Sequence, residues 1–290
     1  MNRAEELVAA LGRDMPLTLS AAGAACQVAE NIVYRSSRGY VPLIGINGAQ
    51  GSGKSTMARL VAEALERFHG RSAAVFSLDD FYLTRSQRQR LERDVHPLCA
   101  TRGVPGTHDI ALLHGVIDGL RAAEPAAETA IPVFDKLADD RVPTEAWQVF
   151  EGRPGAILLE GWCVGARTAD VVAFAGVPNA LERTEDPRGV WRGWSLAALA
   201  REYEDLWDRL DLLVSIEVPD LETVIESRLA QERRLAENSL RPPMDRVAIT
   251  RFVQHYERYT RAMWAAMPER ADMLFRRTRE FGFTLAKEVA

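Results

Sequence analysis

The sequence has few of the residues that form disulfides or bind metals in small proteins. Its three cysteines, Cys26, Cys99 and Cys163, lie far apart and form no C-x-x-C pair, so no disulfide framework is expected. We instead expect free thiols, buried or partly buried, in a reducing compartment. The five histidines show no metal-ligand spacing. His108 and His114, six residues apart, would lie on different faces of a helix.

Long apolar runs and an excess of basic residues are also missing. No run reaches the ~18 apolar residues that a membrane-spanning helix requires, and acidic residues interrupt the apolar pattern at the N-terminus, so we expect no secretory signal. The formal net charge is -5 and the pI is about 5.7. An acidic balance disfavours nucleic acid as a general partner, because phosphate backbones attract basic surfaces. We expect a cytoplasmic protein of enzyme size, with neither a membrane nor a nucleic-acid partner.

Strand-like and helix-like patterns alternate along the 290 residues. Short apolar, β-rich runs predict buried strands at 41–47, 73–78, 155–165 and 210–218. Amphipathic patterns predict helices at 55–68, 109–122, 223–237 and 243–267. This order is typical of an α/β fold with a parallel sheet and helices on both faces. Residues 4–36 have a helical pattern divided at Pro16, so we expect an N-terminal helical extension over 1–40 and the main domain over 41–290.

The clearest motif is a glycine-rich stretch that fits G-x-x-x-x-G-K-[ST] at every fixed position. A predicted strand precedes it and a predicted helix follows it, which favours nucleotide binding over a chance glycine-rich turn. Glycines let consecutive N–H groups point at phosphate oxygens. Lys54 would reach the β- and γ-phosphates, and Ser55 would place its hydroxyl on Mg²⁺. The predicted nucleotide site comprises Gly48, Ala49, Gln50, Gly51, Ser52, Gly53, Lys54, Ser55 and Thr56.

Carboxylates end two of the predicted strands. Glu160 closes the run AILLE, and the carboxyl ends of parallel strands face the ligand crevice, so it is placed to bind Mg²⁺ directly or through water. Asp79 and Asp80 follow AAVFSL, where a carboxylate near a γ-phosphate could accept a proton from an attacking hydroxyl. The alternatives are a solvated glutamate and two aspartates that cap a turn. Strand periodicity does not choose between Asp79 and Asp80.

Two polar loops carry further candidates. TRGVPGTHDI combines Arg102, His108 and Asp109 with glycines and a proline, which suits recognition of an anion or a hydroxyl and equally suits a capped turn. VFDKLADDR contains Asp135, Lys136, Asp140 and Arg141, and taken alone it favours a solvated loop.

The helix predicted over 223–237 places Arg228, Arg233 and Arg234 beside glutamates. A salt-bridged solvent face is the default interpretation. The sharper alternative is a lid that brings an arginine onto a transferred phosphoryl group.

Taken in order, GINGAQGSGKST, SLDDFY, RGVPGTHD, PVFDK and ILLEGW resemble the uridine kinase, phosphoribulokinase and pantothenate kinase superfamily. Within it, the chain most resembles the D-glycerate 3-kinase family and its bacterial kinase-like relatives. The resemblance runs from about Val41 to the C-terminal region and implies a P-loop kinase fold with a helical lid at about 223–240. Two departures concern the acceptor: Phe134 replaces the family's tyrosine, and 179–194 is longer and more charged than expected.

The resemblance also assigns roles to residues. It implies that Asp79 takes the place of the catalytic aspartate, that Glu160 takes the strand-end acidic position and that Arg228 is the matched lid arginine. Lys54 would join Asp79 and Arg228 in catalysis. Residues implied to face the acceptor are Asp80, Tyr82, Arg102, His108, Asp109, Asp135, Lys136 and Arg141.

The implied activity is ATP-dependent phosphorylation, with Mg²⁺, of a hydroxyl on a small, anionic metabolite. D-Glycerate is the leading acceptor; a nucleoside, pantothenate or a sugar phosphate remains an alternative within the kinase class. A regulatory switch that hydrolyses nucleotide is the alternative from another class. Guanine-specific switches usually carry N-K-x-D, and this sequence contains none.

Overall fold

The computed structural model describes residues 2–12, 17–37, 39–237 and 243–289, with no side-chain description for 234–237. The predicted division at Pro16 and the end of the predicted lid, 238–240, lie outside the described residues. Among the described residues no helix is long and apolar enough to cross a membrane.

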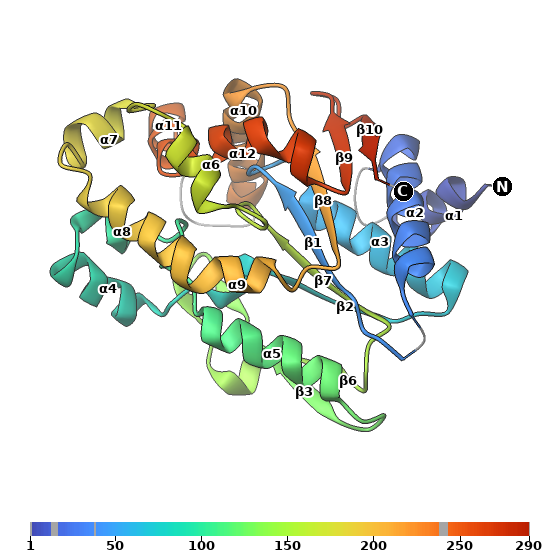
Figure 1. The fold of residues 1–290 in the computed structure, drawn as a ribbon. Helices are drawn as coiled ribbons and strands as arrows, with labels where there is room; N and C mark the ends of the chain where they lie inside the picture. Colours follow the sequence, from blue (N-terminus) through green and yellow to red (C-terminus); the bar gives the residue numbers. More distant parts are fainter. Residues whose placement is uncertain (1, 13–16, 38, 238–242, 290) are drawn as a thin grey trace.

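A six-stranded sheet forms the centre of the molecule, in the order β10-β9-β8-β1-β7-β2 (Figure 1). All neighbours are parallel except β9 and β10, which are antiparallel at one edge. The strands are β1 (Leu43–Gly48), β2 (Ala73–Ser77), β7 (Ala156–Gly161), β8 (Leu212–Glu217), β9 (Met273–Arg277) and β10 (Phe283–Glu288). The mainly parallel α/β sheet predicted from the sequence is therefore confirmed.

Helices cover both faces of this sheet (Figure 1). Leu43 of β1 and Ile157 of β7 pack into the core on one face, whereas Ile44 and Leu158 pack into the core on the other. Both faces are buried, which explains why these strands read as continuous apolar runs without polar alternation.

The first two helices, α1 (Arg3–Leu11) and α2 (Leu19–Arg35), pack beside α3 (Lys54–His69) on one face of the sheet. A capping box between Asn2 and Glu5 begins α1. Leu7 is fully buried. The N-terminal helices therefore complete the hydrophobic core on this side of the molecule.

The remaining helices are α4 (Arg85–Asp94), α5 (Ile110–Ala122), α6 (Thr168–Ala173), α7 (Ala180–Glu185), α8 (Val190–Ala198), α9 (Glu204–Trp207), α10 (Leu221–Glu237), α11 (Arg246–Gln254) and α12 (Glu257–Arg270). Two small antiparallel pairs join β3 (Glu128–Ile131) to β6 (Gln148–Glu151) and β4 (Phe134–Asp135) to β5 (Asp140–Arg141). The prediction of one helix over 243–267 is wrong, because the chain turns at His255 and Tyr256. Tyr256 packs edge-on against Trp162, 4.8 Å between ring centroids, while His255 faces Trp191.

The three cysteines are free and buried, as predicted.

Candidate active site

A cavity of about 480 Å³ opens where β1, β2 and β7 end. Its wall is formed by the glycine-rich loop, by the segments that follow β2 and β7, by α10 and α11, and by the turn between β9 and β10. Ligands of open α/β sheets bind outside the carboxyl ends of the strands. The cavity therefore lies where the sequence motifs predicted a site.

The glycine-rich loop leaves β1 and enters α3 through two left-handed residues, Gly51 (φ 72°) and Gly53 (φ 94°). A Cβ at Gly51 would come within 2.5 Å of the Ser227 Cβ on α10, so this position requires glycine for space as well as for conformation. The residues of the loop that line the cavity are Gln50, Gly51, Gly53, Lys54, Ser55 and Thr56. Ala49 and Ser52 are buried beneath them.

Ser55 and Glu160 form the pair predicted to bind a metal ion. The Ser55 hydroxyl donates to Glu160 Oε1 at 2.6 Å, and Lys54 Nζ lies 3.9 Å from Glu160 Oε2. Oε2 is buried and accepts no hydrogen bond from the described residues. A hydroxyl beside a carboxylate with a spare oxygen fits the oxygen preference of Mg²⁺. No group of three His, Cys, Asp or Glu among the described residues could hold an ion alone, so phosphate and water oxygens would complete the shell.

Asp79 and Asp80 lie in a 3₁₀ turn, Leu78–Phe81, that follows β2. Asp80 turns back on the backbone: its carboxylate accepts from Ser77 N at 3.1 Å and Phe134 N at 3.4 Å. Asp79 lines the cavity, where its carboxylate accepts from Lys136 Nζ at 2.6 Å and from the Tyr82 hydroxyl at 3.0 Å. The turn therefore separates the two carboxylates, which strand periodicity could not do.

Their ionisation differs as well. Burial would raise the pKa of Asp79, but the charges of Lys136 and Lys54 outweigh it and keep that pKa well below its usual range. Burial raises the pKa of Asp80 to about 6, against the opposing effect of the two backbone N–H groups. At neutral pH Asp79 is thus an anion beside the glycine-rich loop, which we also call the phosphate loop. A residue that accepts a proton must be ionised in this way.

The cavity is also lined by Arg102 and Lys136 together with Tyr82, Trp162 and Tyr256. The two cations and the aromatic rings are suited to binding a small anion.

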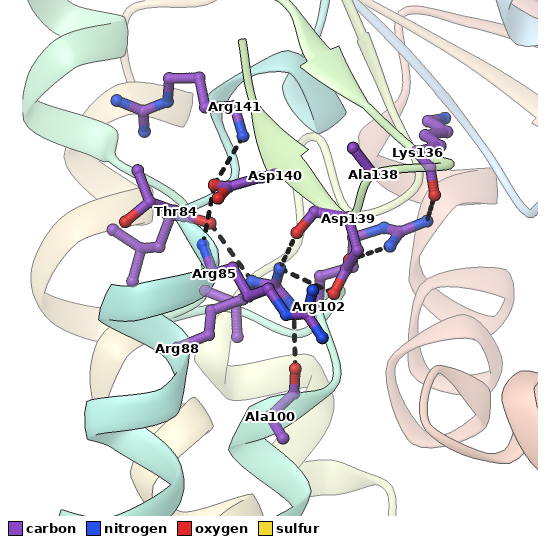
Figure 2. Close-up of polar contacts among 12 residues, drawn as sticks. Thr84, Arg85, Arg88, Ala100, Arg102, Lys136, Ala138, Asp139, Asp140 and Arg141 are labelled. Carbon is purple, nitrogen blue, oxygen red and sulfur yellow. Dashed lines mark hydrogen bonds and ion pairs between the residues drawn. The ribbon is translucent and has the colours of Figure 1, made fainter. Parts of the chain in front are cut away.

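Asp139 anchors this part of the cavity. Figure 2 shows the Arg102 guanidinium paired with its carboxylate, while Arg88 donates to the Asp139 carbonyl at 2.6 Å and to Ala100 O at 2.8 Å. Asp139 has a left-handed backbone (φ 56°), which aspartate tolerates better than most residues. The buried Arg88 therefore fixes the β4–β5 turn that carries Lys136.

Five of the residues expected to face the acceptor do not line the cavity: Asp80, described above, and His108, Asp109, Asp135 and Arg141. Asp109 caps α5 by accepting from Leu112 N at 3.1 Å, and it pairs with Arg141 at 3.3 Å. Asp135 accepts from the N–H groups of its own turn. His108 is buried, 2.7 Å from the hydroxyl of Tyr203. Through these contacts the side chains stabilise the loops around the cavity.

Arg228 reaches the cavity from α10. It is mostly buried, pairs with Glu232 and donates to Gln231 at 2.8 Å. Its guanidinium carbon lies 5.4 Å from the centre of the Phe252 ring. Arg228 thus combines the salt bridge of the default interpretation with the cavity position of the lid interpretation.

Comparison with known proteins identifies the family. No family model matches the sequence. The uncharacterized kinase mug58 of Schizosaccharomyces pombe is 31% identical to this chain over 223 residues, which cover 74% of the chain and 78% of that protein. The chain belongs to this family of P-loop kinases.

Two further kinases extend the comparison. The chloroplastic D-glycerate 3-kinase of Arabidopsis thaliana is 27% identical over 241 residues, 79% of this chain and half of that longer protein. The solved structure of D-glycerate 3-kinase from Cryptococcus neoformans superimposes with a TM-score of 0.70 at 22% identity, over 90% of this chain and 98% of that one. The resemblance inferred from the motifs and the P-loop kinase fold are both confirmed.

Several residues in the cavity of this kinase were missed by sequence reasoning. Trp162 follows Glu160 in ILLEGW and could have been found from that motif. Tyr256, Phe252 and Phe281 come from distant segments whose local sequence carries no motif.

Proposed function

We propose that the kinase transfers the γ-phosphoryl group of ATP to a hydroxyl of a small, anionic metabolite, with D-glycerate as the leading acceptor. The observation that carries the proposal is that the phosphate loop, Asp79, Arg102 and Lys136 line one cavity. These are the groups that a phosphoryl transfer needs for the nucleotide, for the reacting hydroxyl and for an acceptor anion.

The proposed chemistry follows from the side chains around the reacting end. Asp79 orients the acceptor hydroxyl and accepts its proton. Lys54 and Arg228 neutralise charge that develops on the transferred group. Ser55 and Glu160 would hold Mg²⁺, which supplies charge neutralisation between the phosphates when bound.

For the acceptor anion we propose Arg102 and Lys136. The acceptor carboxylate would pair with the Arg102 guanidinium, which Asp139 occupies in the structure. Tyr82 lines the same cavity. Asp80, His108, Asp109, Asp135 and Arg141 would then act by supporting these loops.

The part of the cavity at the turn between β9 and β10 is proposed to take the nucleotide base. Phe281 is 45% exposed and has a left-handed backbone (φ 60°) in the turn between β9 and β10, where it lines the cavity with Arg279. Its ring lies 4.3 Å from the guanidinium carbon of the buried Arg277. An exposed aromatic ring in a strained turn at the mouth of a site supports a stacking role.

Replacing Phe281 by Ala should raise KM for ATP roughly tenfold, because base–aromatic stacking is worth about 1–3 kcal/mol. KM for the acceptor should stay within about twofold, and Phe281→Trp should keep wild-type affinity for ATP. Steady-state kinetics with each substrate varied in turn provide the measurement. Equal changes in the KM for ATP and the KM for the acceptor would indicate that the nucleotide base binds elsewhere.

Replacing Lys136 by Met should move the acid limb of the pH–rate profile to higher pH. Asp79 must be ionised to accept a proton, so activity is lost as the pH falls through its pKa. The Lys136 charge lowers that pKa against the effect of burial, and its removal therefore raises it. The measurement is the profile of kcat/KM between about pH 4 and 8, where wild-type protein should show no acid limb from Asp79 and Lys136→Met should show one. Lys136→Arg, which keeps the charge, should behave as wild type; an acid limb in both variants, or in neither, would contradict this assignment.

We further propose that 41–290 is the kinase domain, that 1–40 is a helical extension of it and that the helix beginning at Leu221 acts as the lid, in a cytoplasmic protein without a nucleic-acid partner. The contact between Gly51 and Ser227 of α10 supports the lid assignment, because it sets this helix directly against the phosphate loop.

An acceptor panel tests the proposed function. The protein is incubated with Mg-ATP and D-glycerate, pantothenate, a nucleoside or a sugar phosphate, and release of ADP is followed. Strong stimulation by D-glycerate supports the leading acceptor, and stimulation by another member reassigns it. Turnover that no acceptor changes, but that a protein partner raises, would favour the regulatory switch and refute the kinase proposal.

A further inference from the structure

The hydroxyl of Tyr203 lies in a part of the fold that no sequence motif marks. Leu199–Tyr203 forms a π-helical turn between α8 and α9. Such turns are rare and frequently occur at functional sites. Tyr203 is fully buried, and its hydroxyl accepts from Gly106 N at 2.9 Å and lies 2.7 Å from His108 Nδ1.

Counting donors assigns the proton of His108. The Gly106 N–H donates to the Tyr203 oxygen, so the hydroxyl proton is free to donate to His108 Nδ1. Nε2 of His108 is buried and has no hydrogen-bond partner among the described residues, so either tautomer leaves that nitrogen unpaired. A proton on Nδ1 would leave the Tyr203 hydroxyl proton without an acceptor as well, whereas a proton on Nε2 leaves only that one N–H unpaired, which costs less. His108 is a neutral imidazole at neutral pH, because burial lowers its pKa to about 3. Its proton is therefore on Nε2.

His108 in turn contacts Tyr82, the residue whose hydroxyl donates to the carboxylate of Asp79. Its ring stacks on Tyr82 with 4.4 Å between centroids and 21° between planes, and the backbones of the two residues form an isolated β-bridge. Phe134 packs edge-on against the Tyr82 ring, with 5.3 Å between centroids. The Tyr82 hydroxyl then donates to Asp79 Oδ1 at 3.0 Å.

We propose that Tyr203 is a positioning residue for phosphoryl transfer, acting through the fixed orientation of His108 and the stacked Tyr82 on the carboxylate of Asp79. This inference rests on the proposed function of Asp79. Tyr203 touches neither substrate: its hydroxyl locks the His108 ring in one orientation and one tautomer, and the stack transmits that orientation. The Asp79 oxygen that accepts from Tyr82 is thereby held while the other faces Lys136.

Replacing Tyr203 by Phe removes only the hydroxyl. We expect kcat to fall roughly 10- to 100-fold, because small displacements of a reacting group have effects of this size. KM for ATP should stay within about twofold, since the phosphate loop is unaffected.

Tyr259→Phe is the matched control. Tyr259 is also buried, and its hydroxyl makes a 2.7 Å hydrogen bond, to Ser195. Both variants should lose similar thermal stability, but Tyr259→Phe should keep kcat within about twofold. If both lose kcat equally, the effect of Tyr203 is a structural one and the proposal fails.

Nitrogen NMR of ¹⁵N-histidine-labelled protein gives a readout that needs no activity. The His108 signals are assigned by their loss in His108→Gln. Wild-type protein should show an unprotonated Nδ1 and a protonated Nε2 at His108, and Tyr203→Phe should show a mixture of tautomers. A protonated Nδ1 in the wild type, or an unchanged tautomer in Tyr203→Phe, would overturn the inference. Absence of kinase activity in wild-type protein with the expected tautomer would instead refute the proposed function.

Discussion

Replacing Asp79 by Asn should lower phosphoryl transfer by roughly 10²- to 10⁴-fold, the range expected when a proton acceptor is lost. The amide has nearly the shape of the carboxylate, and its oxygen can still accept from the Tyr82 hydroxyl. It cannot accept a proton from the acceptor, and it loses the ion pair with Lys136. Affinity for ATP should remain, because the phosphate loop is untouched. Steady-state kinetics and calorimetric titration with Mg-ATP measure the two properties separately.

Asp80→Asn is the control for this prediction. The Asp80 carboxylate is directed at the backbone of Ser77 and Phe134, so its loss should reduce thermal stability while transfer stays within about tenfold of wild type. Normal turnover in Asp79→Asn, with loss of transfer in Asp80→Asn, would show that Asp80 and not Asp79 accepts the proton.

Replacing Lys54 by Met should lower transfer by roughly 10²- to 10³-fold, because a cation aimed at developing charge is lost from the site. Lys54 lines the cavity beside Glu160, at the start of α3. Stabilisation of the protein by ATP, measured as the rise in melting temperature with Mg-ATP, should also largely disappear. Lys287→Met, at a lysine of β10 that donates to the Glu269 carbonyl, should behave as wild type in both assays. Wild-type ATP stabilisation in Lys54→Met would argue against this nucleotide site.

The sheet and the phosphate loop were predictable because their signals are local. The central parallel strands β1, β7 and β8 are buried on both faces, so their apolar runs stand out in the sequence. The loop needs glycine at Gly53 because its backbone is left-handed, and this requirement is visible as a fixed position of the motif. Gly51 is left-handed too, but it occupies a variable position of the motif. The sequence also predicted that Glu160 and the two aspartates lie together at the carboxyl ends of the strands.

Other parts of the site depend on contacts between distant segments. Asp79 and Asp80 are distinguished by the capping of a 3₁₀ turn, which adjacent aspartates do not reveal. His108 and Asp109 were expected to face the acceptor, yet Tyr203 and Arg141 engage them in support of the loops. The turn between α11 and α12 follows from the packing of Tyr256 on Trp162, across 94 residues of sequence separation (256 minus 162).

The most direct test of the account is the fate of the γ-phosphoryl group. Phosphorus NMR of the protein with Mg-ATP and D-glycerate follows ATP, ADP, inorganic phosphate and phosphorylated acceptor in one sample. We predict that ADP and phosphorylated glycerate appear in equal amounts with wild-type protein, and that both form at least roughly 10²-fold more slowly with Asp79→Asn. Formation of ADP and inorganic phosphate alone, with D-glycerate and with each of the other acceptors, would contradict the account.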